Sequence, residues 1–349
     1  MQAQGHQKQM LTHFIERAGA GRALTRAEAE TVMDELLSGR LGTPEIARLL
    51  AALRSRPYAV DELVGFALSM RRHAQPVFTP DEPPLDHLVD TCGTGGDSGG
   101  TFNISTAAAI VAAAAGARVA KHGNRSVSSR CGSADVLEAL GVRIDMPFER
   151  IGAAIREVGI GFIFAQMAHR SMRHASEARR QLGGRTIFNL LGPLTNPAGA
   201  RAQVLGVFSA DAVDLVAAAL ARLGVTRAFV VHGADGLDEI SLAGETLVAD
   251  VQEGSVRRYA ISPEEFGVRR APVASLRGGD ATENAALIRR ILADERGAAR
   301  DVVVVNAAAA LVAAGAAQNF LDGAHLAAQA IRNDAARRTL DALVKFTVG

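Results

Sequence analysis

From about residue 85 onward the sequence alternates short apolar segments with alanine-rich segments, and this alternation constrains the fold more than any other feature. Strands that alternate with helices imply parallel pairing, because each helix returns the chain to the starting edge of the sheet. We therefore expect an α/β domain with a mainly parallel sheet. The predicted strands lie at 88–89, 119–120, 162–164, 204–208 and 228–231, and the predicted helices at 105–115, 134–140 and 210–223. The run at 302–305 fits a buried strand and the start of a buried helix equally well.

The first 76 residues carry the signals of short helices instead. Thr25 and Glu28 have the spacing of a capping box, and Gly39 follows an apolar stripe. Thr43 is expected to cap the next helix. Pro44 would take the first helical position, where a backbone N–H would be unpaired in any case.

The chain is long enough for two packed units. It has 349 residues, of which 48% are hydrophobic, more than one simple core needs. We expect a small helical domain beside a larger α/β domain. Residues 1–76 would form the first part of the helical domain and 77–165 the first part of the α/β domain. Residues 166–200 would be helices that contribute to the helical domain and the hinge, and 201–349 the second part of the α/β domain.

Charge and cysteine content narrow the function. Lysine and arginine number 38 against 37 aspartate and glutamate residues, so no surplus charge favours a nucleic acid or a membrane surface. The two cysteines, Cys92 and Cys131, lack a disulfide or zinc spacing, which suits a reducing cytosol. The start lacks signal-peptide features, and no apolar run reaches ~20 residues. We expect a soluble, cytoplasmic, unprocessed protein without a nucleic-acid or membrane partner.

A glycine-rich loop, Asp90-Thr-Cys-Gly-Thr-Gly-Gly-Asp97, follows the first predicted strand and leads to a helix through Asn103-Ile-Ser-Thr106. Glycines let backbone N–H groups approach an anion closely, and a helix N-terminus adds a favourable partial charge. The loop therefore predicts a phosphate site, although it matches neither standard nucleotide motif. A tight turn before a capped helix is the open alternative.

A second polar loop runs from Lys121 to Arg130, between a predicted strand and the helix that Ser133 opens. It groups cationic and hydroxyl side chains, and a merely solvated loop is the alternative interpretation. Two donor-rich loops at the carboxyl ends of strands favour one shared anion site in an open α/β sheet.

Two further segments carry charges that suit small ligands. The basic helix at 177–185 offers arginines, which grip a carboxylate through two parallel hydrogen bonds, although such helix faces are commonly solvated. Asp238 and Glu239 follow a predicted strand, and their hard oxygen atoms suit Mg²⁺ that already carries phosphate oxygens. An isolated acidic pair is by itself a weak signal.

Six segments together resemble the anthranilate phosphoribosyltransferase family. They are DTCGTGGD, FNIST, KHGNRSVSS, CGSADVLEALG, RTIFNLLGPLTNP and DGLDEIS, they occur in the family's order, and the resemblance covers nearly the whole chain. It implies a helical domain packed on a larger α/β domain, the fold of pyrimidine nucleoside phosphorylases, and a homodimer. It also implies transfer of the phosphoribosyl group from 5-phosphoribosyl 1-pyrophosphate to the amine of anthranilate, which gives N-(5-phosphoribosyl)anthranilate and pyrophosphate in tryptophan biosynthesis.

The resemblance also implies roles for particular residues. Phosphoribosyl pyrophosphate would be bound by Gly93, Gly96, Asp97, Thr101, Asn103, Ile104, Ser105, Thr106, Lys121, His122, Gly123, Asn124, Arg125, Ser126, Val127, Ser128, Ser129 and Ser133. Anthranilate would contact Gly93, Asn124 and Arg179. Two Mg²⁺ ions would be held by Ser105, Asp238 and Glu239. No residue is singled out as a catalytic acid or base, because electrostatic stabilisation and positioning would carry the reaction.

The resemblance is imperfect around the aromatic substrate. His169 matches a histidine that the family often has near this substrate, and a structural histidine is the alternative. His169-Arg170-Ser-Met172 stands where His-Pro-Ala-Met is commoner, and Ser176-Glu177-Ala-Arg179 where Ala-Pro-Val-Arg is commoner. These departures concern the aromatic pocket and not the transfer chemistry.

Two other functions are compatible with the same scaffold. A pyrimidine nucleoside phosphorylase shares the fold, but the acidic pair and the KHGNR loop argue against it. A nucleic-acid-binding relative is disfavoured by the near-neutral charge.

Overall fold

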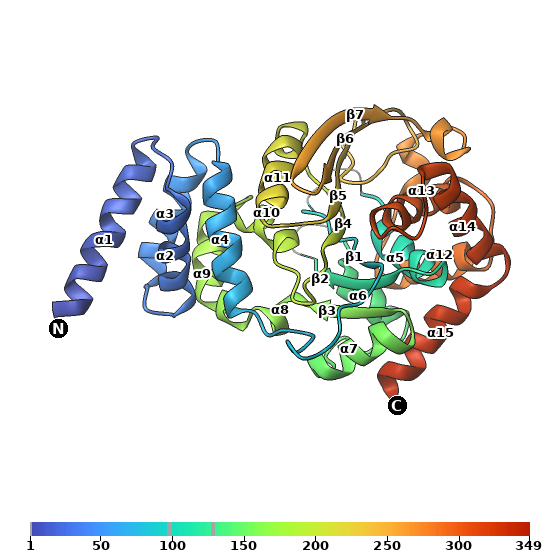
Figure 1. Ribbon diagram of the computed structural model, residues 1–349, viewed down its shortest axis with the longest axis horizontal. Helices are drawn as coiled ribbons and strands as arrows, with labels where there is room; N and C mark the ends of the chain where they lie inside the picture. Colours follow the sequence, from blue (N-terminus) through green and yellow to red (C-terminus); the bar gives the residue numbers. More distant parts are fainter. Residues whose placement is uncertain (1, 96–99, 127–129) are drawn as a thin grey trace.

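A helical unit at one end and a sheet covered by helices at the other make up the molecule (Figure 1). The computed structural model describes residues 2–95, 100–126 and 130–349. The N-terminus lies at the far end of the helical unit, and the last helix, α15 (Ala335–Val348), packs on the sheet-containing unit. Within the described ranges, no helix is long and apolar enough to cross a membrane.

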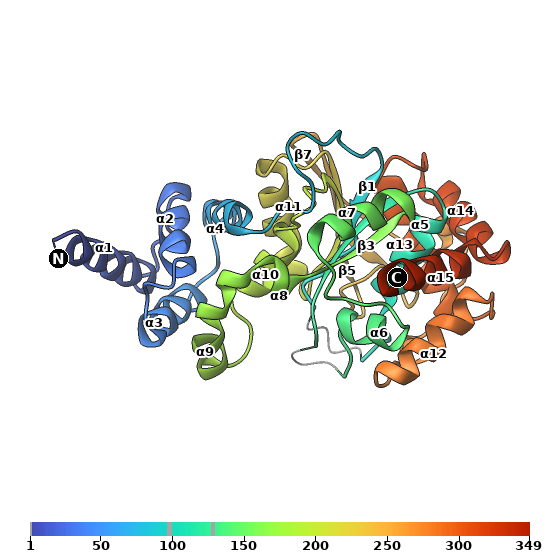
Figure 2. The ribbon, with the colours of Figure 1, turned by 90° about the horizontal axis from the view of Figure 1, so that it is seen from below.

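Two separate parts of the chain build the helical unit. The first part supplies α1 (Gln2–Gly19), α2 (Arg26–Leu37), α3 (Thr43–Arg54) and α4 (Val60–His73). The second supplies α8 (Ala165–Ala168), α9 (Arg173–Leu182) and α10 (Phe188–Leu191), with 3-10 turns at Arg170–Met172 and Gly192–Leu194. α9 packs against α3, and α10 against α4. Figure 2 shows α8 and α10 between α9 and the sheet.

The helix starts follow from local hydrogen bonds. The predicted capping box is confirmed: Thr25 Oγ1 accepts from Glu28 N at 3.3 Å, and the Glu28 carboxylate accepts from Thr25 N at 2.7 Å. The predicted cap at Thr43 is wrong by one residue. α3 already begins at Thr43, because Glu45 reaches back to Gly42 N at 2.7 Å and makes Gly42 the cap residue.

The sheet has seven strands in the order β3-β2-β1-β4-β5-β6-β7. Five are parallel, as predicted: β1 (Leu88–Asp90), β2 (Arg118–Gly123), β3 (Ile160–Phe164), β4 (Ala202–Gly206) and β5 (Arg227–Gly233). The hairpin of β6 (Thr246–Gln252) and β7 (Ser255–Ile261) is antiparallel and was not predicted. Glu253 and Gly254 both have positive φ, the requirement of a two-residue hairpin turn.

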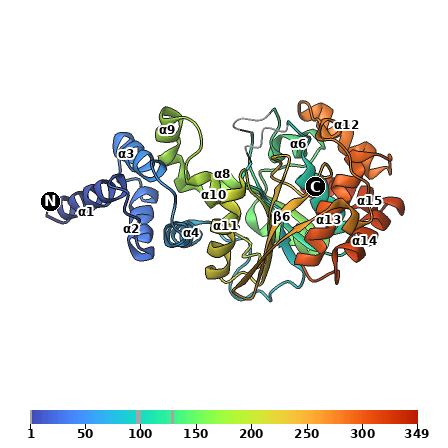
Figure 3. The same cartoon turned by 90° about the horizontal axis from the view of Figure 1, so that it is seen from above.

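Helices cover both faces of the sheet (Figure 3). One core joins the strands to α5 (Ile104–Ala114), α6 (Ser133–Ala139), α12 (Ala281–Leu292), α13 (Ala298–Ala313), α14 (Phe320–Arg332) and α15. On the opposite face lie α7 (Phe148–Glu157) and α11 (Ala210–Arg222). Two 3-10 turns, Pro263–Phe266 and Val273–Leu276, pack against the first core. The core of the helical unit continues into α11, so the two units are packed together. The ambiguous run at 302–305 is helical and lies inside buried α13.

Candidate active site

Three loops converge beyond the carboxyl ends of β1, β4 and β5. Thr94 N donates to the carbonyl of Gly206 at 2.8 Å, and Phe208 N donates to Thr94 Oγ1 at 3.1 Å. A Cβ atom on Gly206 would lie 1.5 Å from the carbonyl oxygen of Asp238, so only glycine permits this approach. The glycine-rich loop and the acidic pair, distant in sequence, therefore meet at one edge of the sheet, as the parallel topology requires.

Lys121 lies in strand β2, not in a loop as the sequence indicated, and only 2% of it is exposed. Pairing of Lys121 with Phe162 extends β2 beyond the apolar residues that identified it. Its Nζ donates to Thr91 O at 3.2 Å, Thr91 Oγ1 at 3.3 Å and Ser105 Oγ at 3.5 Å. The ammonium group thus joins the glycine-rich loop to the start of helix α5.

Glu239 closes the same cluster from the opposite side. Its Oε1 accepts from Ser105 N at 3.2 Å, so a carboxylate stands at the N-terminus of α5, where the helix dipole favours negative charge. Asn306 on α13 fixes this loop: its side chain accepts from Ile240 N and donates to Ile240 O, each at 3.0 Å. The acidic pair is consequently positioned by helices on both of its sides.

The donors in this cluster fit magnesium. Asp238 and Glu239 are half-buried, and an ideal Cβ on Gly93 would lie 3.4 Å from Asp238 Oδ2. The Ser105 hydroxyl lies beside them. Two carboxylates and a hydroxyl supply hard oxygen ligands but too few for a complete shell, which is how Mg²⁺ is held when phosphate oxygens supply the rest. A small pocket between Gly93, Ser105 and Glu239 opens at this point.

Behind the cluster lies a group formed by the buried residues Asp90, His122 and His169 and the half-buried Cys92. Burial raises the pKa of Asp90 to about 6 and lowers that of His122 to about 3 and that of His169 to about 4. Burial also raises the pKa of the Cys92 thiol. Ligand atoms of Asp90, Cys92 and His122 lie within 4.8 Å of one another, but sulfur and imidazole suit softer ions than magnesium.

Both histidines of this group, His122 and His169, are buried. His122 belongs to β2, is 3% exposed, and finds no partner for its ring nitrogens among the described residues. His169 Nε2 lies 3.4 Å from Thr195 Oγ1, and its ring centroid is 5.3 Å from that of His122. With 8% exposure, His169 has the surroundings of a structural histidine.

A second cluster forms where β2 ends. Ser133 Oγ accepts from Asn124 N at 3.2 Å, and Gln166 Nε2 donates to Asn124 Oδ1 at 3.3 Å. Arg125 is exposed and forms ion pairs with Asp135 and Glu138, so its charge is already partnered. Within the described part of this loop, the positive charge of Arg125 is therefore balanced by carboxylates of α6.

The remaining predicted phosphate ligands lie at the edges of these clusters. Thr101 forms an isolated bridge with Arg277. Asn103 Nδ2 donates to Cys131 O at 3.1 Å, and Asn284 Nδ2 donates to Asn103 Oδ1 at 3.0 Å. Ile104 and Thr106 belong to the first turn of α5, and Gly123 ends β2. Ser126 N donates to Asp135. Gly96, Asp97, Val127, Ser128 and Ser129 lie outside the described residues.

Arg179 lies on α9 in the helical unit and not at the strand ends. Its guanidinium carbon is 5.2 Å from the ring centroid of Phe188, and burial lowers its pKa. No carboxylate within the described ranges forms an ion pair with it. A half-buried guanidinium without an acidic partner is available for a ligand carboxylate.

Sequence reasoning missed three residues that shape the site: Thr91, Gly206 and Asn306. Thr91 lies in the glycine-rich segment Asp90–Asp97, but nothing in the sequence indicates that it bonds to Lys121. Gly206 lies inside the apolar run 204–208, and a glycine within a strand pattern indicates close backbone approach. Asn306 interrupts the run of valines and alanines in α13, and a lone polar residue in such a run signals a buried hydrogen bond.

The helical bundle and the α/β domain match two family models. Residues 12–74 match the helical bundle domain of a glycosyl transferase family, and residues 85–337 match its a/b domain. Fold and site therefore define a glycosyl transferase of this two-domain class.

Curated relatives and solved structures narrow the class. The anthranilate phosphoribosyltransferase of Pelotomaculum thermopropionicum is 54% identical over 338 residues, which cover 97% of each chain. The crystal structure of the Thermus thermophilus enzyme has a TM-score of 0.89 and 47% identity and covers 96% of this chain and 99% of its own. The Saccharomyces cerevisiae enzyme, solved in complex with PRPP and Mg, has a TM-score of 0.86 and 25% identity over 97% and 98% of the two chains. This chain belongs to the anthranilate phosphoribosyltransferase family.

Proposed function

We propose that the convergence of the glycine-rich loop, Lys121 and the acidic pair is the site at which this chain transfers a phosphoribosyl group to anthranilate. The chain is an anthranilate phosphoribosyltransferase by family, and its products are N-(5-phosphoribosyl)anthranilate and pyrophosphate. The observation that carries the site is the bond from Ser105 N to Glu239, which brings the phosphate loop and the carboxylates to one helix N-terminus.

The phosphate groups would contact backbone N–H groups of the glycine-rich loop and the N-terminus of α5. The resemblance adds the side chains from Thr101 to Thr106 and from Lys121 to Ser133 to this contact surface. Lys121 supplies a buried positive charge behind the loop. Such fixed donors stabilise charge that develops on the departing pyrophosphate without reorganising during the reaction.

Magnesium binding is supported by the donor set and by the yeast complex with PRPP and Mg. Bound Mg²⁺ would offset charge on the phosphate oxygens. We propose two ions, one at Ser105 and Glu239 and one at Asp238 and Glu239. Glu239 would then serve both, in agreement with its central place between α5 and Asp238.

Anthranilate would lie between Gly93, Asn124 and Arg179. The aromatic amine is a neutral nucleophile at pH 7, so the chain needs to orient it and exclude water, with no strong base. Residues 166–200 carry Arg179 and connect back to the sheet, and we propose them as the hinge that moves the anthranilate side toward the phosphate side.

Two further properties are proposed, one from the resemblance and one from the cysteine content. We propose a homodimer, which light scattering of the purified protein measures directly. We also propose a cytoplasmic location, which the two free thiols of Cys92 and Cys131 support.

Mixing the protein with anthranilate, phosphoribosyl pyrophosphate and Mg²⁺ is expected to consume anthranilate, followed as loss of its fluorescence. Pyrophosphate should appear in equal amount. The comparison reaction is phosphorolysis of a pyrimidine nucleoside by inorganic phosphate. Turnover of the nucleoside without turnover of anthranilate would contradict the proposal.

Replacing Arg179 by alanine is expected to raise the KM for anthranilate at least about tenfold with little change in the KM for phosphoribosyl pyrophosphate. Removing one partner of a buried charged pair costs on the order of 2 to 5 kcal/mol. Arg180→Ala is the matched control, because Arg180 is exposed and pairs with Glu177 on the same helix. Equal losses for both substrates would show that Arg179 supports the fold and not anthranilate.

A further inference from the structure

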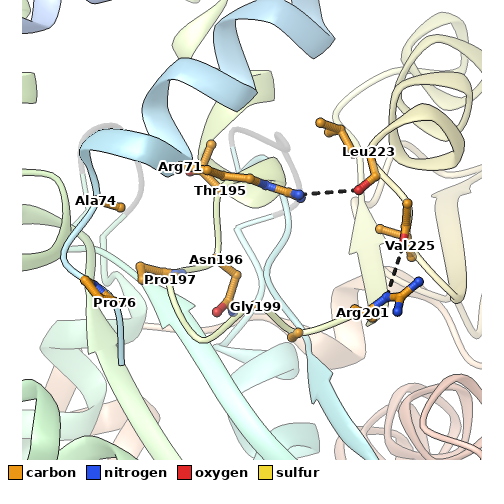
Figure 4. A pocket seen from close by; sticks show the side chains of 12 residues that line it. Arg71, Ala74, Pro76, Thr195, Asn196, Pro197, Gly199, Arg201, Leu223 and Val225 are labelled. Atoms are coloured by element: carbon orange, nitrogen blue, oxygen red, sulfur yellow. Dashed lines mark hydrogen bonds between the residues drawn. The ribbon is translucent and has the colours of Figure 1, made fainter. Parts of the chain in front are cut away.

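A second pocket lies near the amino ends of the parallel strands, whereas the active site lies beyond their carboxyl ends (Figure 4). Arg201 and Val225 line this pocket and lie one and two residues before the starts of β4 and β5, respectively. Its other walls are the end of α4 and the segment 195–200. The pocket holds about 200 Å³ and is thus shared by the helical unit and the sheet-containing unit.

Two arginines face this pocket without an acidic partner. Arg71 Nε donates to Leu194 O at 2.8 Å and its Nη1 to Leu223 O at 3.5 Å, and Arg201 Nε donates to Gly224 O at 3.1 Å. Within residues 2–95, 100–126 and 130–349, neither guanidinium has a carboxylate at ion-pair distance. Arg71 is half-buried, and this burial lowers its pKa, as expected for a partly desolvated cation without a counter-ion.

Each guanidinium keeps N–H donors for a ligand. Arginine has five such donors in a planar fork, and the described contacts use two of Arg71 and one of Arg201. The pocket's other polar side chains are already engaged: Thr195 Oγ1 bonds to Gly192 O, and Asn196 Nδ2 to Ala120 O. The carbonyls beside the arginines already accept from them. The lining therefore carries positive charge and no negative side chain.

A purely structural role explains only part of this arrangement. Arg71 joins α4 to the loop after α11, so it acts as a clamp between the two units. A clamp does not account for the second, exposed arginine on the opposite wall or for the hollow between them. Two guanidinium groups that line one hollow and have N–H donors left suit a bound phosphate.

We propose that this pocket binds a phosphate group, free or as the end of a small metabolite, between Arg71 and Arg201. The site is separate from the proposed transfer site and does not depend on it. Because both units line the pocket, the bound group would join them on the face opposite to the substrates.

The test uses the full chain with its transfer site occupied by phosphoribosyl pyrophosphate and Mg²⁺. Inorganic phosphate and, separately, ribose 5-phosphate are titrated by calorimetry. We expect one binding event in the parent and an affinity at least tenfold weaker in Arg201→Gln. The matched control is Arg222→Gln, which removes the same charge from the nearby end of α11, where Arg222 pairs with Asp61 outside the pocket. This control should bind like the parent.

Tighter binding of ribose 5-phosphate would identify a phosphate ester as the ligand, and equal binding would identify phosphate itself. Crystals soaked in tungstate should show anomalous density between Arg71 and Arg201. The proposal is wrong if the parent binds no phosphate even without phosphoribosyl pyrophosphate, whose own phosphate end could fill the pocket. It is also wrong if Arg201→Gln and Arg222→Gln bind phosphate equally, or if tungstate leaves this pocket empty. Thermal melting of Arg201→Gln checks that the fold survives.

Discussion

Replacing Lys121 by methionine is expected to lower kcat/KM for phosphoribosyl pyrophosphate by roughly two to three orders of magnitude, the range for loss of one fixed donor to developing charge. Methionine fills the buried space but removes the ammonium that joins Thr91 and Ser105. Direct contact of Lys121 with phosphate oxygens stays a prediction. Lys121 also holds the glycine-rich loop in place through its bonds to Thr91, so loss of these bonds would lower kcat/KM as well. Steady-state kinetics at saturating anthranilate measures the effect.

The stability of this variant should depend on pH in a defined direction. Lys121 is among the groups that lower the pKa of Asp90, which burial raises to about 6. Without the lysine that pKa rises further, so the folded variant binds a proton that the unfolded chain has lost. Stability then falls as pH rises, and the melting temperature relative to the parent should be lower at pH 8 than at pH 6. Lys345→Met, at an exposed position on α15, is the control and should match the parent in both tests.

Local signals in the sequence located the parallel strands and some of the helices, but not α7, α12, α14 or α15. The alternation of strands and helices predicted the five parallel strands, and the Thr25 capping box set the start of α2. The β6–β7 hairpin was not predicted. Its strand β7 is an exposed edge strand, and charged residues such as Arg257 and Arg258 interrupt the apolar pattern by which a strand is recognised.

The site was only partly predictable because its contacts join distant parts of the chain. The motif around Lys121 was recognisable, but a lysine in a polar run reads as part of a loop. Only pairing with β3 shows that it belongs to a buried strand. In the same way, nothing near Asp238 in sequence indicates that Gly206 and Asn306 hold its loop. Such contacts depend on topology, which local patterns do not encode.

Glu239→Gln and Asp238→Asn are expected to leave the fold intact and to impair magnesium use to different degrees. Each amide keeps the shape of its parent and removes the charge that holds a hard cation. Glutamine retains an oxygen that accepts from Ser105 N, so Glu239→Gln keeps this bond and loses the favourable charge at the α5 N-terminus, a contribution of about 1 kcal/mol. Thermal melting without ligands measures that loss.

The kinetic loss should be much larger than the loss of stability, and larger at Glu239 than at Asp238. Glu239 is proposed to serve two ions and Asp238 one, so at limiting Mg²⁺ we expect kcat/KM to fall roughly a hundredfold and tenfold, respectively. Added Mg²⁺ should restore Asp238→Asn and not Glu239→Gln. Glu245→Gln is the matched control, because Glu245 is an exposed carboxylate just before β6. Parent-like turnover of both variants at limiting Mg²⁺ would refute the metal role and leave the charge on pyrophosphate to the glycine-rich loop and Lys121.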